Sequence, residues 1–413
     1  MSVIVPFRAV RPRKEFVKEV ASYPYDIVSS DEARKIAEGN PRSFLHVIKS
    51  EIDLPPEVDI HDNIVYKTAR KNFDTLLNEG ILFQESVPCF YIYRQTEGKH
   101  EQYGIIAGVS VEEYESGLIK KHELTRVAKE IDRTKHIAAV NAHTGPVLAI
   151  YRGRDSIDRI VEKITNARPE YDFTADDGIS HTAWIVDNEE DIKNVKEDFL
   201  EIDSLYIADG HHRAASAATV TGRRRIENQN HRGDEEYNYM MAVLFPHDQL
   251  RIMDYNRIVK DLNGLSEEEF IGKVAEKFSM SRNFEDKSPG KLHEFGMYLG
   301  GIWFRLQAKN GSYDKSDVKG VLDVSILQNN ILSPLLGISD PRSDERIDFF
   351  GGPAGMGRLE ELVDSGEFAV AFSLYPTTLA QMMNIADAGR IMPPKSTWFG
   401  PKPRSGIFVH LLE

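Results

Sequence analysis

The chain has 413 residues, of which 41% are hydrophobic and 28% are charged, as is usual for globular proteins. Its net charge of −14 argues against a protein that binds nucleic acid through phosphate contacts, so we expect no nucleic-acid partner. The lone cysteine, Cys89, allows no internal disulfide and no thiolate cluster, which is typical of a reducing cytoplasm. No apolar run reaches the length of a membrane span, so we expect a cytoplasmic protein with no membrane partner. The sequence leaves the oligomeric state open.

The first part of the chain alternates strand-like and helical patterns. Strands are indicated by aromatic and β-branched runs, and helices by apolar residues at helical spacing with polar caps and glycine stops. The predicted elements are strands at 3–12 and 26–28, a helix at 30–39, a strand at 43–51, a helix at 65–80 and a hairpin at 88–111.

The middle part continues the alternation. It predicts a helix late in 111–142, a strand at 146–151, a helix at 154–169, a strand at 181–188, a helix at 188–201, a strand at 205–208, a helix from 211 to about 222 and a strand at 239–246. The three arginines at 223–225 fall in a charged loop of this part. That loop is either ordinary solvated surface or a lid over an anionic ligand.

The pattern restarts near residue 250. It predicts helices at 265–278, 323–336, 357–367 and 378–389, a hairpin at 297–308, a strand at 368–376, and a loop and strand at 395–412. The glycine-rich run at 348–355 lacks the lysine and spacing of a P-loop. We therefore predict a mixed α/β (α+β) protein with regions 1–110, 111–250 and 251–413.

The segment YIADGHHRAASAA, residues 206–218, carries the strongest chemical signal. A buried strand ends in Asp209-Gly210, and a helix rich in small residues follows. Gly210 allows a tight turn, while the free amides of the helix N-terminus and the guanidinium of Arg213 suit a phosphate. Asp209 could hold a magnesium ion or orient a substrate, and a histidine could steady a phosphate or transfer a proton. His211 and His212 diverge by about 100° on a helix, so we expect only one in the site. The alternative is a structural turn.

Other segments add candidate ligands. MPPKSTWFGPKPRSG combines cations, hydroxyls and rigid turns, as loops that hold phosphate do. With Gly210, its candidate phosphate or nucleotide ligands are Lys395, Ser396, Thr397, Lys402 and Arg404. The candidate substrate-binding residues, in PFRAVRP and YPYDIV, are Arg8, Arg11, Tyr25 and Asp26. For these four, plain packing is the alternative.

Over nearly its full length the chain resembles a conserved uncharacterised family, domain of unknown function 1015. The resemblance is carried by PFRAVRP, YPYDIV, KKHELT, ADGHHRAASA and MPPKSTWFGPKPRSG. The DGHHR turn is similar to the signature of the ParB/sulfiredoxin-like fold, in the form found in free-serine kinases. The resemblance implies a ParB/sulfiredoxin-like core with additional N- and C-terminal α/β regions. The turn lacks the cysteine of a sulfiredoxin-type reductase, and the chain shows neither the turn nor the DNA-binding region of ParB-type proteins.

The resemblance implies a small-molecule kinase that phosphorylates free L-serine or a similar amino acid, with ATP or ADP and Mg²⁺ as cofactors. Glu123, in KKHELT, would accept the hydroxyl proton, Asp209 would orient substrate or metal, and His211 or His212 with Arg213 would hold the phosphate. A solvated glutamate is the alternative for Glu123. For the whole protein, the alternatives are a nucleotide or phosphoester hydrolase, or a non-catalytic sensor of serine, phosphoserine or nucleotide.

Overall fold

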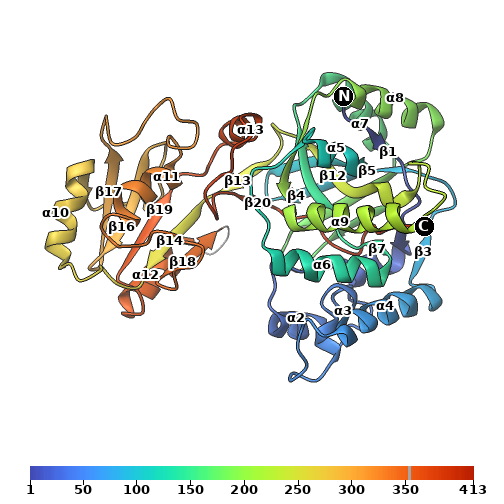
Figure 1. Cartoon of the computed structure of the whole chain (residues 1–413), viewed down its shortest axis with the longest axis horizontal. Coiled ribbons are helices and arrows are strands. Elements are labelled where there is room, and N and C mark those ends of the chain that lie inside the picture. The colour runs from blue at the N-terminus through green and yellow to red at the C-terminus, as the bar shows by residue number, and fades with distance from the viewer. Residues whose placement is uncertain (352–354) are drawn as a thin grey trace. The chain divides into compact units, whose positions relative to one another are not determined.

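The computed structural model describes residues 1–351 and 355–413, which form two compact units (Figure 1). The first unit comprises Met1–Leu250 together with Pro401–Glu413, and the second comprises Arg251–Gly400. The chain leaves the first unit once and returns to it at its end. The mixed α/β class is confirmed, whereas the limits of the three regions expected from the sequence stay a prediction. The glycine-rich run at 348–355 lies partly outside the described residues.

A mixed sheet of nine strands, all within the described residues 1–246, forms the centre of the first unit. Its strands are β1 (Ile4–Val5), β4 (Phe90–Glu97), β5 (His100–Ser110), β6 (Ile119–Lys120), β8 (Val147–Tyr151), β9 (Tyr171–Thr174), β10 (Ser180–Val186), β11 (Leu205–Asp209) and β12 (Tyr239–Pro246). They pair in the order β6-β11-β8-β12-β5-β4-β10-β9, and β1 also pairs with β5. The β11–β6 and β12–β8 pairs are parallel and the other pairs are antiparallel.

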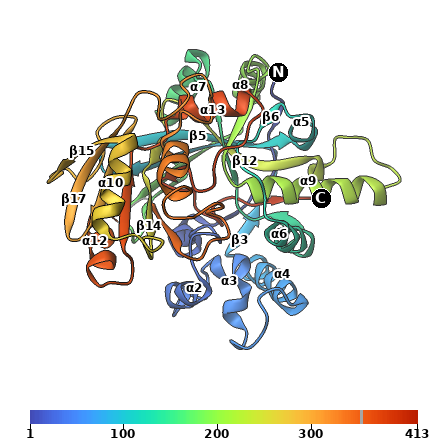
Figure 2. The same ribbon diagram turned by 60° about the vertical axis from the view of Figure 1, so that its left-hand side comes forward.

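Helices cover this sheet in successive layers. They are α1 (Val17–Val20), α2 (Ser30–Ala37), α3 (Leu45–Ile48), α4 (Asn63–Asn78), α5 (Val111–Ser116), α6 (Val127–Val140), α7 (Asp155–Thr165), α8 (Glu189–Leu200) and α9 (His211–Glu227). α9 contacts β8, α6 packs along α9, and α4 packs along α6 (Figures 1 and 2). The buried side chains of Ala214, Ala215 and Ala217 are small, which lets α9 lie close to its neighbours.

The closing segment of the chain completes the core beneath α1–α4. Val409 is fully buried in a cluster that also contains Phe44 and Phe73. Val409 exchanges backbone hydrogen bonds with Val10, in β2 (Val10–Pro12), which pairs with β3 (Leu82–Gln84). The next strand, β21 (His410–Leu411), pairs with β7 (Ala142–His143). The chain end is therefore an integral part of the first unit.

The second unit has its own antiparallel sheet of six strands, counted over the described part of residues 251–400. The strands are β14 (Tyr255–Val259), β15 (Phe278–Arg282), β16 (Glu294–Leu299), β17 (Ile302–Ala308), β18 (Ile347–Gly351) and β19 (Val370–Leu374), paired in the order β15-β17-β16-β19-β14-β18. The helices are α10 (Glu267–Lys277), α11 (Asp323–Leu327), which continues as a π-helical turn (Gln328–Leu332), α12 (Gly355–Asp364) and α13 (Leu379–Asp387). The entering β13 (Arg251–Met253) pairs with the leaving β20 (Trp398–Gly400).

Residues 43–51, expected as a strand, instead form α3 followed by a 3-10 turn, Ser50–Asp53. Leu45, Val47 and Ile48 are all buried, a pattern that the fully buried strand β8 shows as well. The apolar run is too short for its period to distinguish strand from helix.

Two further segments differ from expectation. Residues 26–28, expected as a strand, form a turn. The arginines at 223–225, expected in a loop, lie in the last turns of α9, where cations interact favourably with the helix dipole. Arg225 there forms an ion pair with Glu115 at 2.9 Å. Residues 223–225 are therefore part of a helix and do not form the basic loop that the sequence predicted.

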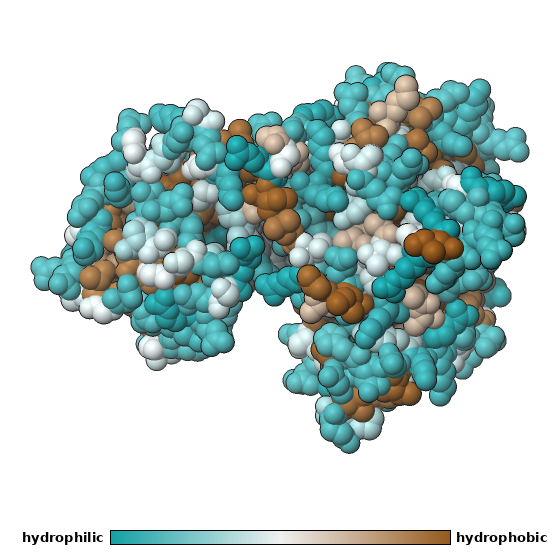
Figure 3. Space-filling model, viewed as in Figure 1, coloured by the Kyte–Doolittle hydropathy of each residue, from teal (hydrophilic) through white to brown (hydrophobic). Residues whose placement is uncertain are grey.

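The surface in Figure 3 is mostly hydrophilic, with separate apolar patches. Leu124, Val127 and Ile131, on α6 and just before it, are exposed apolar side chains. Among the described residues, no helix combines the length and the apolar character that a bilayer crossing requires.

Replacing Gly406 by alanine tests how closely the closing segment packs. Gly406 has φ +86°, and a Cβ there would lie 2.6 Å from Cγ of Phe44. We expect Gly406→Ala to lower the free energy of unfolding by about 3 kcal/mol, from backbone strain and overpacking together. Gly178→Ala is the control, because Gly178 has φ +80° but a Cβ there would meet no atom within 4 Å. Equal losses in urea unfolding would show that the contact with Phe44 does not matter.

Candidate functional site

The DGHHR segment forms the corner between β11 and α9. A bulge in the pairing of β11 with β8 falls between Ile207 and Asp209, just before the turn. Gly210 follows with φ +93°, and a Cβ there would lie 3.4 Å from Cα of Val147. Both the backbone conformation and the close approach of Val147 therefore favour glycine. α9 begins at His211 without a side-chain cap, so its first amides face the corner.

The carboxylate of Asp209 lies between two cations. Lys402 Nζ is 2.9 Å from Oδ1, and Arg213 Nη2 is 3.5 Å from Oδ2. Arg213 also donates to Asp26 at 3.3 Å and to the carbonyl of Pro146. Burial would raise the pKa of Asp209, but the charges of Lys402 and Arg213 outweigh burial and hold this pKa well below its usual value. Asp209 is thus a permanent anion that aligns two cations.

The two histidines of the turn have different surroundings. His211 is buried, and its ring meets the ring of His122 edge-on, with centroids 4.5 Å apart. His212 accepts a hydrogen bond from the backbone N–H of Arg126 at 2.9 Å. Burial lowers the pKa of both, helped by His122 for His211 and by Lys129 for His212. Both rings are therefore neutral at neutral pH.

His122 also lies at this corner, where the sequence did not predict a role for it. Burial lowers the pKa of His122 to about 4. His122, Glu123 and His211 each present one potential metal-ligand atom, and the three atoms lie within 4.8 Å of one another. Neutral imidazoles and a carboxylate are ligands for zinc-like cations. The position of His122 beside Glu123 in KKHELT was the available signal, and only the fold shows that it meets His211.

The magnesium site expected at Asp209 does not match this arrangement. Magnesium binds through several oxygen ligands at short range. The Asp209 oxygens instead face an ammonium and a guanidinium group, and Asp209 is outside the group of three possible metal ligands. We therefore derive no step through a magnesium ion held by Asp209.

A cavity of about 310 Å³ lies next to Asp26. Its lining includes the apolar residues Ile60 and Val65, together with Tyr25 and Lys129. Burial, reinforced by Asp26, raises the pKa of Tyr25 to about 12. Tyr25 is therefore a neutral hydrogen-bonding group where the cavity meets the corner.

Several expected site residues lie together at the corner, and others do not. Brought together are Asp209, Gly210, His211, His212, Arg213, Glu123, Asp26, Tyr25 and Lys402. Glu123 Oε2 is 3.9 Å from Nδ1 of His211, and its side chain is 48% exposed. That exposure leaves its carboxylate accessible to a ligand.

The remaining candidates have other partners. Arg11 is buried in ion pairs with Glu85 at 2.5 Å and Glu170 at 2.8 Å, which indicates a structural role. Arg8 is exposed. Arg404 pairs with Asp177 and stacks on the ring of Tyr23 at 3.7 Å.

Lys395, Ser396 and Thr397 belong to the second unit, whereas Lys402 and Arg404 belong to the first. The boundary at Gly400–Pro401 thus divides the proposed phosphate loop. The backbone carbonyl of Lys395 accepts a hydrogen bond from Arg257, in β14, at 2.8 Å. The hydroxyl of Ser396 donates to the carbonyl of Pro393 at 2.6 Å.

The model of one family, described as protein of unknown function (DUF1015), matches residues 4–325, and no curated protein matches the chain. A conserved hypothetical protein from Pyrococcus furiosus is similar over 75% of this chain and 95% of its own, with 13% identity and a TM-score of 0.35. A free serine kinase in complex with AMP is similar over 73% of this chain and 92% of its own, with 13% identity and a TM-score of 0.34. SbnI with a C-terminal truncation, from Staphylococcus aureus, is similar over 73% of this chain and 85% of its own, with 10% identity and a TM-score of 0.38.

Breaking the pair between Lys402 and Asp209 should destabilise the first unit. Lys402→Met removes the closer cation from a carboxylate that is only 25% exposed, so we expect a loss of about 3 kcal/mol. Asp209→Asn combined with Lys402→Met should cost less than the sum of the single changes, because no charge then remains unpaired. Urea unfolding of the four proteins gives this double-mutant cycle. Strictly additive losses would show that the two side chains do not interact.

The buried histidines predict a stability that depends on pH. The unfolded chain protonates each imidazole near pH 6.5, whereas His122 in the folded chain has a pKa of about 4. Between these values the unfolded state binds more protons, so stability falls as the pH falls through this window. Across each pH unit in this window, the factor by which the folding equilibrium constant falls should be roughly tenfold smaller for His122→Gln than for the wild-type protein. The partly exposed His100 supplies the control variant, His100→Gln, and an equal change of slope in both variants would contradict the assignment.

Proposed function

This chain belongs to the family described as protein of unknown function (DUF1015), and from this premise and the β11–α9 corner we propose that it is a small-molecule kinase. The reaction is transfer of the terminal phosphoryl group of ATP or ADP to the hydroxyl of free L-serine or a similar amino acid. The partners are thus a nucleotide and an amino acid.

One observation carries the proposal: Lys402 and Arg213 meet at the uncapped N-terminus of α9. Phosphoryl transfer requires mainly positioning and neutralisation of charge on the transferred group. Lysine, arginine and helix amides all interact favourably with phosphate oxygens. The exposed cations of Lys121 and Lys129 are close enough to lower the pKa of His211 and His212, so they add positive potential at this corner. This local field contrasts with the acidic chain as a whole.

In this proposal the carboxylates of Asp209 and Glu123 have different roles. Asp209, kept ionised, aligns Lys402 and Arg213. Glu123 is accessible at the edge of the corner and accepts the proton of the substrate hydroxyl. The hydroxyl oxygen attacks the terminal phosphorus, the bond from phosphorus to the nucleotide oxygen breaks, and the nucleotide leaves as ADP or AMP. Lys402 and Arg213 compensate the charge that develops on the leaving oxygen.

The cavity beside Asp26 fits the organic part of a ligand. Its volume of about 310 Å³ is at the lower end of the range for small-molecule pockets. The apolar side chains of Ile60 and Val65 suit a flat base, and Lys129 and Tyr25 provide polar contacts. We assign the nucleoside to this cavity, which places its phosphates toward Arg213.

The proposal is tested by phosphorus NMR of the protein with L-serine and either ATP or ADP, with and without magnesium. We expect a phosphoserine signal, and a loss of at least about a hundredfold in rate for Glu123→Gln, because a positioned base contributes that much. Glu112→Gln, at an exposed site on α5, is the matched control and should keep the wild-type rate. Absence of phosphoserine with both donors, in protein shown to be folded, would refute kinase activity.

A second candidate function is a metal-dependent phosphoester or nucleotide hydrolase, and the grouping of His122, Glu123 and His211 favours it. A bound metal ion there would lower the pKa of a water molecule and supply a nucleophile. Glu123 has a different role in each case, as a base in the kinase and as a ligand in the hydrolase. Phosphate release without serine that depends on added zinc or manganese would favour the hydrolase.

A further inference from the structure

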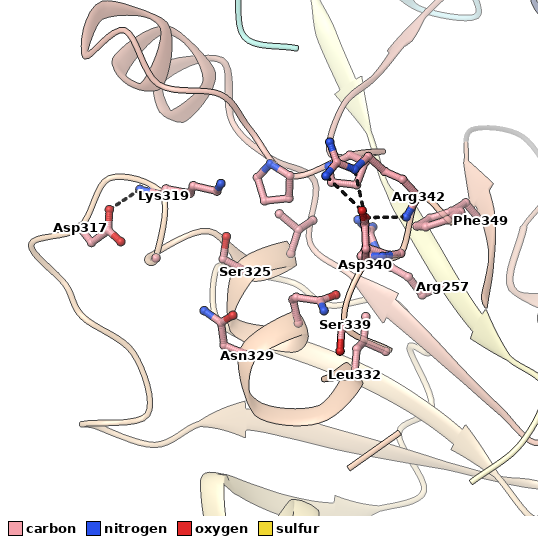
Figure 4. A pocket seen from close by; sticks show the side chains of 16 residues that line it. Arg257, Asp317, Lys319, Ser325, Asn329, Leu332, Ser339, Asp340, Arg342 and Phe349 are labelled. Carbon is pink, nitrogen blue, oxygen red and sulfur yellow. Dashed lines mark hydrogen bonds and ion pairs between the residues drawn. The ribbon is translucent and has the colours of Figure 1, made fainter. Parts of the chain in front are cut away.

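The second unit contains a cavity of about 420 Å³, and all the residues that line it belong to this unit. Its walls come from β14, from α11 and the π-helical turn after it, from the loop at 339–342, from β18 and from Pro393–Pro394 (Figure 4). Cavities of this volume are within the usual range for sites that bind small molecules.

Arg257, in the wall of this cavity, is a buried cation without an acidic partner among the described residues. It is 3% exposed, and its guanidinium donates to the backbone carbonyls of Tyr255 and Lys395. The ring of Phe349 lies 5.4 Å from its central carbon. Burial lowers the pKa of Arg257 to about 10, which still leaves it charged at neutral pH. Buried charges normally have a counter-ion, so a bound anion would stabilise this guanidinium.

Ser325, on α11, supplies an independent observation at the same cavity. It is 5% exposed, and its Oγ has no hydrogen-bond partner within residues 1–351 and 355–413. A buried hydroxyl without a partner is unfavourable, and such groups in native proteins commonly mark a missing ligand or water. Figure 4 shows Ser325 and Asn329 on one side of the cavity, with Arg342 and Phe349 on the other.

The remaining charges around the cavity do not neutralise Arg257. Asp340 is occupied by the guanidinium of Arg342, which donates to its two oxygens at 3.0 and 3.1 Å. Asp317 accepts a hydrogen bond from the backbone N–H of Lys319 at 3.1 Å. The lining thus holds three cations, Arg257, Lys319 and Arg342, against two carboxylates, and is positive by one charge. This excess contrasts with the net charge of −14 for the chain.

We propose that the cavity of the second unit binds a small organic anion whose carboxylate or phosphate group pairs with Arg257 and accepts a hydrogen bond from Ser325. The fork of donors on arginine matches the two oxygens of such groups. The apolar walls of Leu332, Phe349 and the two prolines contact the body of the ligand. The site is a second ligand site, and it does not depend on the kinase proposal.

The proline-rich loop, expected from the sequence to bind phosphate, also contributes to this site. Pro393 and Pro394 line the cavity, and the carbonyl of Lys395 holds the guanidinium of Arg257. The loop therefore contributes backbone and rigid proline rings to the second unit, whereas Lys402, beyond the unit boundary, contributes its side chain to the first.

Hydrogen exchange measured by mass spectrometry on the full chain tests the proposal, because it reports each unit separately. The probes are inorganic phosphate and acetate, each compared with chloride at the same ionic strength. We expect at least one probe to slow exchange in peptides covering 320–342. Protection by phosphate alone assigns a phosphate ligand, and protection by acetate alone assigns a carboxylate. The kinase proposal is judged independently, from phosphoserine formation.

Three variants sharpen the test. Arg257→Gln should weaken the probe's apparent affinity at least about tenfold, because it removes a charged partner. Ser325→Ala should weaken it about threefold while keeping the fold, since it removes a hydroxyl that has no protein partner. Arg305→Gln removes a cation from the exposed side of the same unit and should leave the affinity unchanged.

The proposal is overturned if neither probe protects 320–342 in the wild-type protein, or if the Arg257→Gln and Arg305→Gln proteins respond alike. If Arg257→Gln fails to fold, Ser325→Ala decides: unchanged affinity in that variant rejects the site.

Discussion

The ion pair between Asp209 and Lys402 is the interaction on which the first unit depends. Its partners are 193 residues apart, one at the end of β11 and the other in the segment that closes the chain. A carboxylate at this depth is unfavourable unless it is paired, so the corner is complete only when the chain has returned from the second unit. The same pair aligns Arg213 and thereby joins the closing segment, the sheet and α9 in one electrostatic group.

Burial acts in opposite ways on the two kinds of side chain at this corner. Asp209 remains charged because two cations outweigh the loss of solvation. For His122 and His211, burial outweighs the attraction of the Asp209 carboxylate, so their rings stay neutral. The corner therefore combines fixed charges that suit a phosphate with neutral imidazoles that retain lone pairs. This combination explains why both a phosphotransferase and a metal-dependent hydrolase are compatible with the same few residues.

The two units differ in how they stabilise a buried cation, Lys402 in the first unit and Arg257 in the second. Lys402 is paired with a carboxylate, and the pair is built into the fold. Arg257 is held by backbone carbonyls beside an open cavity, so its charge is oriented without being neutralised. A paired cation stabilises a structure, whereas an oriented and unneutralised one favours recruitment of an anion. This contrast supports the proposed ligand site in the second unit.

The sequence alone determined the mixed α/β class, the strand-turn-helix at Asp209–Arg213 and the chemistry that this turn offers, because these depend on local spacing and residue type. The sequence also indicated that His211 and His212 have separate surroundings, because adjacent residues diverge on a helix, but both lie at the corner, where only one was expected. Residues 43–51 form a helix and a 3-10 turn where a strand was expected, because a short apolar run has no clear period. The meeting of His122 with His211, the pairing of Lys402 with Asp209, and the division of the proline-rich loop between two units were decided by tertiary structure. These contacts join residues far apart in the chain, and their energies come from burial, which no local pattern encodes.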